Sequence, residues 1–256
     1  FIANSSRVQE ALRAIEEFTR MTDPKLSGLA SILRYEVYAI EVKIINAKEG
    51  TKTRKILKNA PIYLITSSRQ NLEDVVLQAL KAGIKIVQYR EKILNDEEKV
   101  NQARKLACHC KKYNSIFIVN DRIDIALAVD ADGVHLGQED LPTKIARKIL
   151  GSEKIIGRST HCINDIKNAE DEGCDYIGIG SIFSSKTKSK LNPIGIDHLT
   201  EALSKTHLPA FAIGGINSSN INKLNHINNL RIAVSDAIIN SNDPFLKTEE
   251  LLKFLT

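Results

Sequence analysis

Polar and charged residues alternate along one short stretch, Gln88-Tyr89-Arg90-Glu91-Lys92. If this stretch ends a β-strand, the alternation sends Gln88, Arg90 and Lys92 to one side. Two cations and an amide that converge on one point suit a multiply charged phosphate, because Arg and Lys both bind phosphate oxygens. An ordinary charged strand end held by salt bridges has the same sequence, so the motif alone leaves the two interpretations equally open.

Two aspartates follow the next two apolar stretches: Asp121 comes after residues 116–120, and Asp140 comes after residues 133–136. If these stretches are neighbouring parallel strands, both carboxylates approach one point, and such a pair suits Mg²⁺, which completes its shell with waters and substrate phosphate oxygens. The structural alternative is that Asp140 caps the next helix and Asp121 pairs with Arg122. His135 lies within the second stretch, and we expect a hydrogen-bonded wall residue rather than a metal ligand.

Small hydroxyl side chains follow a further apolar stretch in Arg158-Ser159-Thr160-His161. Ser159 and Thr160 stand where a helix would begin, which is a favourable position for an anion. Helix capping alone would also explain either residue. His161 is a candidate general acid or base, although nothing in the sequence shows how its ring is oriented.

Two later segments also predict anion binding. Residues 184–193 are rich in Ser, Thr and Lys, which is typical of a flexible lid that brings cations over an anionic substrate, and a solvated loop without function is the alternative. Gly214-Gly215 and Ser235 follow the last two apolar stretches. Glycines allow backbone N–H groups to approach a phosphate closely, so these two loops predict a second phosphate site.

The elements that must position these residues are short β-rich stretches that alternate with amphipathic helices from Pro61 onward. We expect strands at Ile62 to Thr66, Ile84 to Tyr89, Ile116 to Asn120, Gly133 to Leu136, Ile155 to Arg158, Tyr176 to Ile179, Ala210 to Ile213 and Arg231 to Val234. We expect helices to begin near Leu72, Asp96, Ile123, Thr143, Ile163, Ile196, Ser218 and Asp243. Eight such units in the 196 residues of 61–256 favour a small (β/α)8 TIM barrel, an α/β fold, over an open doubly wound sheet.

The first 54 residues carry helical periodicity only and predict an N-terminal helical hairpin before the barrel. We expect Ser5 or Ser6 to cap its first helix, Asp23-Pro24 to start the second, and the polar stretch 49–54 to be a linker. This gives a helical extension at 1–54 and a barrel at 61–256. Two helices bury little alone, so their apolar stripes must meet another surface, and the opening at Phe1 indicates a fragment of a larger N-terminal region.

Composition excludes several other classes of protein. The 256 residues are 43% hydrophobic, and no apolar run approaches the roughly 18 residues of a membrane span, so we expect a soluble globular protein without a membrane partner. The net charge of +5 is scattered and Trp is absent, which argues against nucleic acid. We interpret the four cysteines as reduced thiols of a cytoplasmic protein, and Cys108 and Cys110 as lying on different faces of a helix.

Taken together, seven segments in register resemble the thiamine phosphate synthase family. They are Gln88-x-Arg90-x-Lys92, Asn120-Asp121-Arg122, residues 133–140, Gly157-Arg158-Ser159-Thr160-His161, Thr187-Lys188, Ile213-Gly214-Gly215-Ile216 and Val234-Ser235. The resemblance implies a transferase that joins a hydroxymethylpyrimidine diphosphate to a thiazole phosphate, carboxylated or not, with release of pyrophosphate. The N-terminal helices resemble part of an extension on longer members of the family.

The resemblance also implies a role for each matching residue. Those expected to bind the pyrimidine diphosphate are Gln88, Arg90, Lys92, Asn120, Ser159 and Lys188, of which Lys92, Lys188 and Ser159 would be catalytic. Those expected to bind the thiazole phosphate are Ser185, Thr187, Gly215, Val234 and Ser235. Asp121 and Asp140 would hold Mg²⁺. The implied reaction is dissociative: pyrophosphate leaves before the thiazole nitrogen attacks, and no protein nucleophile is needed.

The lid departs from the family pattern, because Ser185-Lys186-Thr187-Lys188 has a serine in place of a threonine and an additional lysine.

One rival function is a thiazole tautomerase, a relative that moves a proton with a histidine at the position of His161. A phosphosugar epimerase or isomerase would share only the second phosphate site, and a catalytically inactive barrel with an assembly role would have no use for these residues. The partners predicted are therefore small-molecule substrates, and a homo-oligomer is compatible with the sequence.

Overall fold

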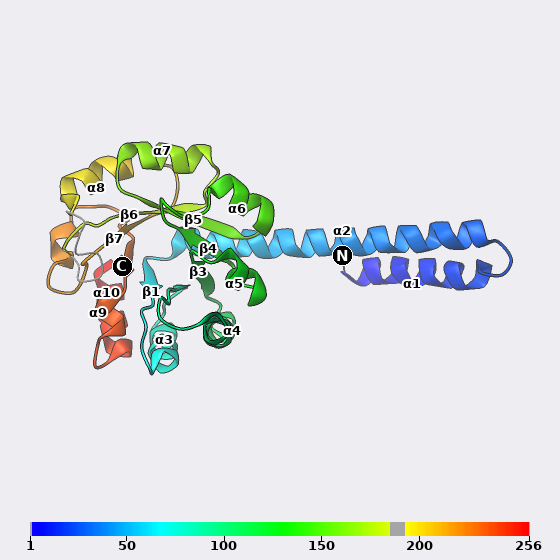
Figure 1. Ribbon diagram of the computed structural model, residues 1–256, viewed down its shortest axis with the longest axis horizontal. Helices are drawn as coiled ribbons and strands as arrows, with labels where there is room; N and C mark the ends of the chain where they lie inside the picture. The colour runs from blue at the N-terminus through cyan, green and yellow to red at the C-terminus, as the bar shows by residue number, and fades with distance from the viewer. Residues whose placement is uncertain (1, 185–192, 256) are drawn as a thin grey trace. The chain divides into compact units, whose positions relative to one another are not determined.

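Eight parallel strands close into one barrel in the order β1 to β8, with β8 paired to β1. Figure 1 shows the helices α3 to α8 around these strands. In this computed structural model residues 2–184 and 193–255 are described. The strands are β1 (Ile62–Ile65), β2 (Ile86–Tyr89), β3 (Ile116–Asn120), β4 (Gly133–Leu136), β5 (Ile155–Thr160), β6 (Tyr176–Gly180), β7 (Ala210–Ile213) and β8 (Ile232–Val234). The predicted (β/α)8 barrel is confirmed, and every predicted strand is present within two residues at each end.

Helices follow the strands and cover the outside of the barrel. They are α3 (Leu72–Lys81), α4 (Asp96–Lys112), α5 (Ile123–Ala128), α6 (Thr143–Leu150), α7 (Ile163–Asp171), α8 (Gly195–Ser204), the 3₁₀ helix η2 (Ile221–Leu224), α9 (Asp236–Ile239) and α10 (Pro244–Leu255). Helix α4 shows why these segments begin where they do. The Asn95 side chain accepts from Glu98 N–H, and the Glu98 carboxylate accepts from Asn95 N–H, which is a complete capping box.

The segment after β7 differs from prediction, because it forms only the 3₁₀ helix η2 where an α-helix was expected from Ser218. Asparagine side chains there bond to the local backbone: Asn220 Oδ1 accepts from Asn217 N–H, and Asn217 Oδ1 accepts from Ser219 N–H. Such bonds compete with helical ones and favour turns. A short helix that was not predicted, α9, begins at Asp236 directly after β8.

Side chains inside the barrel come from alternate strand positions. On β1, Tyr63 and Ile65 belong to the interior cluster, whereas Ile62 and Leu64 belong to the cluster between strands and helices. The interior cluster also includes Leu57, which precedes β1 and is 1% exposed. These buried side chains fill the barrel interior as a packed core.

Two compact units divide the chain at residues 1–52 and 53–256. The first is a hairpin of α1 (Ile2–Thr19) and the greater part of α2 (Pro24–Asn59), and Asp23 starts α2 as predicted, since its carboxylate accepts from Lys25 and Leu26 N–H. Ser5 does not cap α1. It lies inside the helix and donates to Glu41 at 3.0 Å, because α1 begins earlier, at Ile2.

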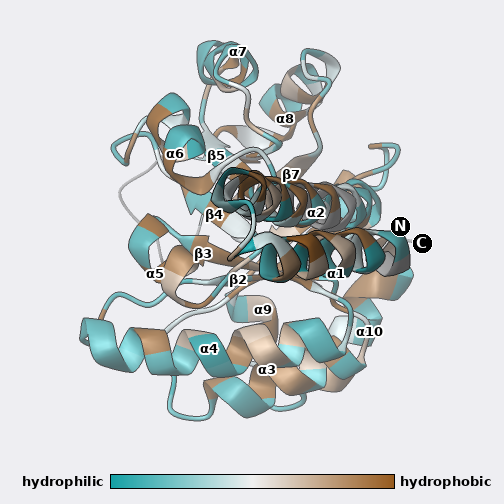
Figure 2. Ribbon diagram, turned by 90° about the vertical axis from the view of Figure 1, so that its right-hand side faces the viewer, coloured by the Kyte–Doolittle hydropathy of each residue, from teal (hydrophilic) through white to brown (hydrophobic). Residues whose placement is uncertain are grey.

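The hairpin exposes apolar side chains, and Figure 2 shows brown and teal residues interleaved along α1 and α2. Phe18 and Met21 are 90% and 92% exposed. The linker predicted at 49–54 is wrong, because α2 continues through it to Asn59. Its lysines, glutamate and arginine favour a helix, and the single Gly50 costs only about 1 kcal/mol. Among the described residues, no helix is long and apolar enough to span a membrane.

Candidate active site

A cavity of about 540 Å³ opens at the carboxyl ends of the strands. Its walls include seven residues expected to bind substrate, which are Gln88, Arg90, Asn120, Ser159, Gly215, Val234 and Ser235. They come from β2, β3, β5 and β8 and from the loop after β7. The barrel therefore brings together groups that lie up to 147 positions apart in the sequence (235 − 88).

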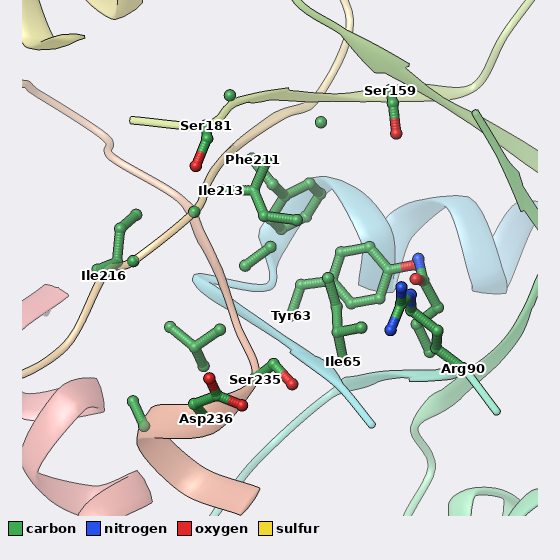
Figure 3. Close-up of a pocket in the computed structure, with 18 of the residues that line it drawn as sticks. Tyr63, Ile65, Arg90, Ser159, Ser181, Phe211, Ile213, Ile216, Ser235 and Asp236 are labelled. Carbon is green, nitrogen blue, oxygen red and sulfur yellow. The ribbon is translucent and has the colours of Figure 1, made fainter. Parts of the chain in front are cut away.

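One side of the cavity is apolar and aromatic. Figure 3 shows the Tyr63 ring between Phe211 and Arg90, with Ile65 and Ile213 nearby. The Tyr63 and Phe211 ring centroids are 5.3 Å apart in an edge-on arrangement. An apolar, aromatic wall beside a few polar groups is typical of a small-molecule site, in which the apolar side buries a ring and the polar groups fix its orientation.

The first predicted cluster divides between the cavity wall and its rim. Gln88 is buried and Arg90 is half-buried, and both line the cavity. Lys92 lies two residues further on, where its Nζ is 2.5 Å from Asp121 Oδ2. The alternation of β2 thus directs the amide and guanidinium inward and leaves the ammonium beside the predicted metal ligands.

Asp121 and Asp140 lie side by side. Burial, followed by the adjacent Asp121 carboxylate, raises the pKa of the Asp140 carboxyl above its ordinary value. Asp140 Oδ2 also accepts from Gly137 N–H at 2.6 Å. Asp121 has a positive φ of 62°, which an aspartate tolerates but seldom adopts. Like charges held this close favour a cation between them.

The structural alternative for these aspartates is wrong. Arg122 pairs with Asp96 and Asp124 rather than with Asp121. Asp140 caps no helix, because α6 begins at Thr143 with Pro142 at its N-cap. Among the described residues no three His, Cys, Asp or Glu side chains gather around one point. The chemistry of two carboxylates with open positions fits Mg²⁺, which keeps waters and takes phosphate oxygens.

Ser159 belongs to a buried chain of hydrogen bonds rather than to a helix cap. Its Oγ is 3.0 Å from His135 Nε2, and His135 Nδ1 is 3.1 Å from the Tyr176 hydroxyl. The Tyr176 hydroxyl lies 2.7 Å from that of Tyr63, which accepts from Gln88 Nε2 at 2.7 Å. His135 is thus the hydrogen-bonded wall residue that was expected.

Helix capping by Thr160 is excluded as well, because its hydroxyl donates to the Gly178 carbonyl and Cys162 occupies the N-cap of α7. His161 lines the cavity, and its Nδ1 lies within hydrogen-bond distance of the Gly180 carbonyl oxygen. Since a carbonyl only accepts, Nδ1 carries a proton in this arrangement. The ring therefore has a fixed orientation that the sequence could not reveal.

The second predicted anion site is formed by the loops after β7 and β8. Gly215 has φ of 68°, and a Cβ at this position would lie 2.4 Å from the Ser184 carbonyl oxygen, so only glycine fits. Val234 ends β8, and Ser235 stands at the N-cap of α9. In Figure 3 Ser235 lies well apart from Ser159, so the cavity has two separate polar ends.

Three predicted residues, Ser185, Thr187 and Lys188, lie outside the described part of the chain. Two residues of the site were missed by sequence reasoning, namely Tyr63 and Tyr176. Burial raises the pKa of both phenols, so both stay protonated and can donate hydrogen bonds. A possible signal was a tyrosine at an inward position of an otherwise aliphatic strand.

Comparison with known proteins identifies two segments. The family described as thiamine monophosphate synthase matches residues 62–238, and the ThiD2 family matches residues 1–43. A thiamine-phosphate synthase of Prochlorococcus marinus is 50% identical over 250 residues, which are 98% of this chain and 72% of that protein. A second strain has a thiamine-phosphate synthase that is 49% identical over 258 residues, covering 99% of this chain and 73% of its own.

Solved structures are also similar to the barrel part of the chain. Thiamine phosphate pyrophosphorylase from Pyrococcus furiosus superposes with a TM-score of 0.69 and 35% identity, over 79% of this chain and 96% of that one. The 3-hexulose-6-phosphate synthase of Salmonella typhimurium has a TM-score of 0.58 at 16% identity, over 75% of this chain and 98% of its own, and shares the fold alone.

Proposed function

The chain belongs to the thiamine monophosphate synthase family, and from that premise we propose how its barrel carries out the reaction. It is a transferase of thiamine biosynthesis that makes thiamine phosphate from small-molecule substrates. In our proposal residues 61–256 are the catalytic domain and 1–54 an extension. The substrates are a hydroxymethylpyrimidine diphosphate and a thiazole phosphate, with or without a carboxylate.

The observation that carries this proposal is one cavity with two separate polar ends and an aromatic wall between them. At the first end Gln88 and Arg90 line the cavity with Asn120 and Ser159, and Lys92 stands at the rim. These groups would bind the pyrimidine diphosphate. Lys188, outside the described residues, would join them.

At the second end Gly215, Val234 and Ser235 would bind the thiazole phosphate through backbone N–H groups and the serine hydroxyl. The positive φ of Gly215 and its close approach to the Ser184 carbonyl require a glycine here, and the loop therefore has no side chain at this position of the cavity wall. Ser185 and Thr187 of the lid would contribute further hydroxyls.

Asp121 and Asp140 would hold Mg²⁺ at the diphosphate end, since their adjacent carboxylates repel each other without a cation. When bound there, Mg²⁺ neutralises charge on the departing pyrophosphate. Lys92, already paired to Asp121, is placed to contact the same oxygens.

The chain's residues then have three tasks in a dissociative reaction. Arg90, Lys92 and Ser159 stabilise the leaving pyrophosphate, as does Lys188. The wall formed by Tyr63 and Phe211 excludes water from the pyrimidine methylene cation, which water would otherwise hydrolyse. The phosphate site at the other end holds the thiazole so that its nitrogen can attack this carbon.

A second candidate function is proton transfer on the thiazole phosphate by His161, as in a thiazole tautomerase. It is favoured by one observation: His161 lines the cavity with its ring held by the Gly180 carbonyl. Proton exchange needs neither diphosphate nor metal. Lys92, Asp121 and Asp140 therefore favour the synthase reaction, and we place the tautomerase second.

The decisive experiment mixes both substrates with Mg²⁺ and the full chain and measures pyrophosphate release. We expect release that depends on both substrates and stops with a chelator. A folded chain without release, but with metal-independent proton exchange on the thiazole phosphate, would favour the second function instead.

A cytoplasmic location and assembly into a homo-oligomer also stay predictions. The cytoplasmic location is supported by the four free cysteines.

A further inference from the structure

Five buried or half-buried side chains form one continuous hydrogen-bonded chain across the barrel, from β2 through β1, β6 and β4 to β5. In order they are Gln88, Tyr63, Tyr176, His135 and Ser159. We refer to them as the Gln88–Ser159 chain. Only its two ends, Gln88 and Ser159, are expected to bind the pyrimidine diphosphate. Of the three residues between them, Tyr63 contributes its ring to the cavity wall, and Tyr176 and His135 have no role assigned in the reaction.

The chain has a direction, because its first member can only donate. Gln88 Nε2 has hydrogens but no lone pair, so the Tyr63 oxygen accepts from it. The Tyr63 proton is then donated to Tyr176, since otherwise it would be buried without an acceptor. Tyr176 in turn donates to His135 Nδ1.

This direction fixes what each end offers to a ligand. With Nδ1 accepting, His135 carries its proton on Nε2 and donates it to Ser159 Oγ, so the Ser159 proton is left for the cavity. At the other end the Gln88 amide oxygen accepts no hydrogen bond from the described residues, and Gln88 lines the cavity. One end thus offers a donor and the other an acceptor.

A rotation of the Gln88 amide by 180° would reverse all four hydrogen bonds and exchange these properties if two further changes accompany it. The Tyr63 and Tyr176 hydroxyls must rotate, and His135 must change tautomer, losing the proton on Nε2 and binding one at Nδ1. Gln88 would then present an NH₂ group to the cavity, and Ser159 would present a lone pair. An anion at Ser159 stabilises only the first state, because it needs a donor there. The state selected by the anion is also the state in which Gln88 accepts a hydrogen bond.

We propose that the Gln88–Ser159 chain is a positioning device that makes recognition of the substrate's anion at Ser159 and of an amino group at Gln88 interdependent. The inference rests on the proposed function for the identity of the ligand. A diphosphate at one end orients Gln88 to accept from the amino group of the pyrimidine ring. A ring with a carbonyl in place of the amino group meets the Gln88 oxygen as a second acceptor. Tyr63, Tyr176 and His135 are therefore specificity-determining residues although they act through others.

The test compares dissociation constants of the aminopyrimidine diphosphate and its oxo analogue, measured by calorimetry with Mg²⁺ on the whole chain. We expect the wild type to prefer the amino compound by about tenfold or more, because the oxo compound leaves buried acceptors unpaired. Tyr176→Phe keeps the ring but breaks the chain, so the Gln88 amide can rotate independently. The preference should then fall by at least about fivefold, with a smaller change in affinity for the amino compound itself.

Tyr89→Phe is the matched control, because the Tyr89 hydroxyl donates to Gln102 at 2.9 Å outside the Gln88–Ser159 chain. It should leave the preference unchanged. If Tyr176→Phe does not fold, Tyr63→Phe breaks the chain one position earlier and is expected to give the same loss. A wild type without preference, or a folded variant that retains it in full, would overturn the inference. Because binding is measured without turnover, absence of pyrophosphate release would refute only the proposed function.

Discussion

Replacement of Asp140 by asparagine should affect stability in opposite directions with and without Mg²⁺. Without metal, the Asp140 carboxylate is partly buried beside Asp121, and its pKa is raised for that reason. Two charges about 4 Å apart at an effective dielectric constant of about 20 repel by roughly 4 kcal/mol. Lys92 offsets most of this repulsion energy, because its Nζ is 2.5 Å from Asp121 Oδ2. Solvent reaches both Lys92 and Asp121 and screens the remaining charge.

We therefore expect Asp140→Asn to increase the metal-free unfolding free energy by about 1 kcal/mol at pH 7, or about 2–4 °C in Tm for a domain of this size. With Mg²⁺ the order should reverse. The wild type gains about 2.7 kcal/mol when the metal is at 100 times its Kd, whereas the variant should gain little. Turnover should fall by about 10²-fold or more, because charge on the leaving group is no longer balanced.

Thermal unfolding with and without Mg²⁺, followed by a pyrophosphate-release assay, measures all three quantities. Glu139→Gln is the control, since it removes an exposed carboxylate from the adjacent position and should change neither stability nor the response to metal. If Asp140→Asn lowers metal-free stability and leaves the Mg²⁺ shift intact, Asp140 is a structural residue and the reasoning from charge repulsion is refuted.

Three further predictions concern the phosphate site, the lid and a structural carboxylate. Gly215→Ala places a Cβ 2.4 Å from the Ser184 carbonyl oxygen at φ of 68°, so KM for the thiazole phosphate should rise by about tenfold or more while KM for the pyrimidine diphosphate changes little, as steady-state kinetics would show. Lys188→Ala should lower kcat more than it weakens thiazole binding, and an unchanged kcat would remove Lys188 from the reaction. The pKa of Glu170 is lowered because a backbone N–H and a threonine hydroxyl donate to it, so its contribution is present above the unfolded pKa and lost as pH falls through the folded one. Glu170→Gln should thus cost about 1 kcal/mol in urea unfolding at pH 7 and much less near pH 3, and an equal cost at both pH values would contradict this assignment.

Much of the barrel is predictable because each strand stretch is short, β-branched and followed by a polar turn. The parallel order and closure follow from eight regular units. Two of the wrong local predictions arise where composition is ambiguous. Charged residues at 49–54 suit a helix as well as a linker, so α2 runs through them. Asparagine and serine near Asn217 bond the backbone locally, so the segment after β7 stays a 3₁₀ helix.

Positions of site residues are predictable for a related reason: the end of each strand faces the same side of the barrel. This places Arg90 and Ser235 at one cavity although the sequence separates them widely. The choice of partner in each salt bridge is less predictable. Arg122 could pair with its neighbour Asp121 or with more distant carboxylates, and only the fold shows that it pairs with Asp96 and Asp124.

The interior hydrogen bonds could not be predicted, because they join side chains from five strands whose relative heights depend on barrel stagger. Tyr176 is an example, because its position depends on a glycine of the neighbouring strand. Its ring occupies the space beside Gly157, where a Cβ would lie 2.1 Å from the ring. A glycine inside a strand indicates a close approach but not its partner. Once Tyr176 lies there, its hydroxyl reaches both Tyr63 and His135, and the same packing that fills the barrel sets the polar ends of the cavity. We therefore expect specificity in this site to depend on buried core residues as well as on those that touch the ligand.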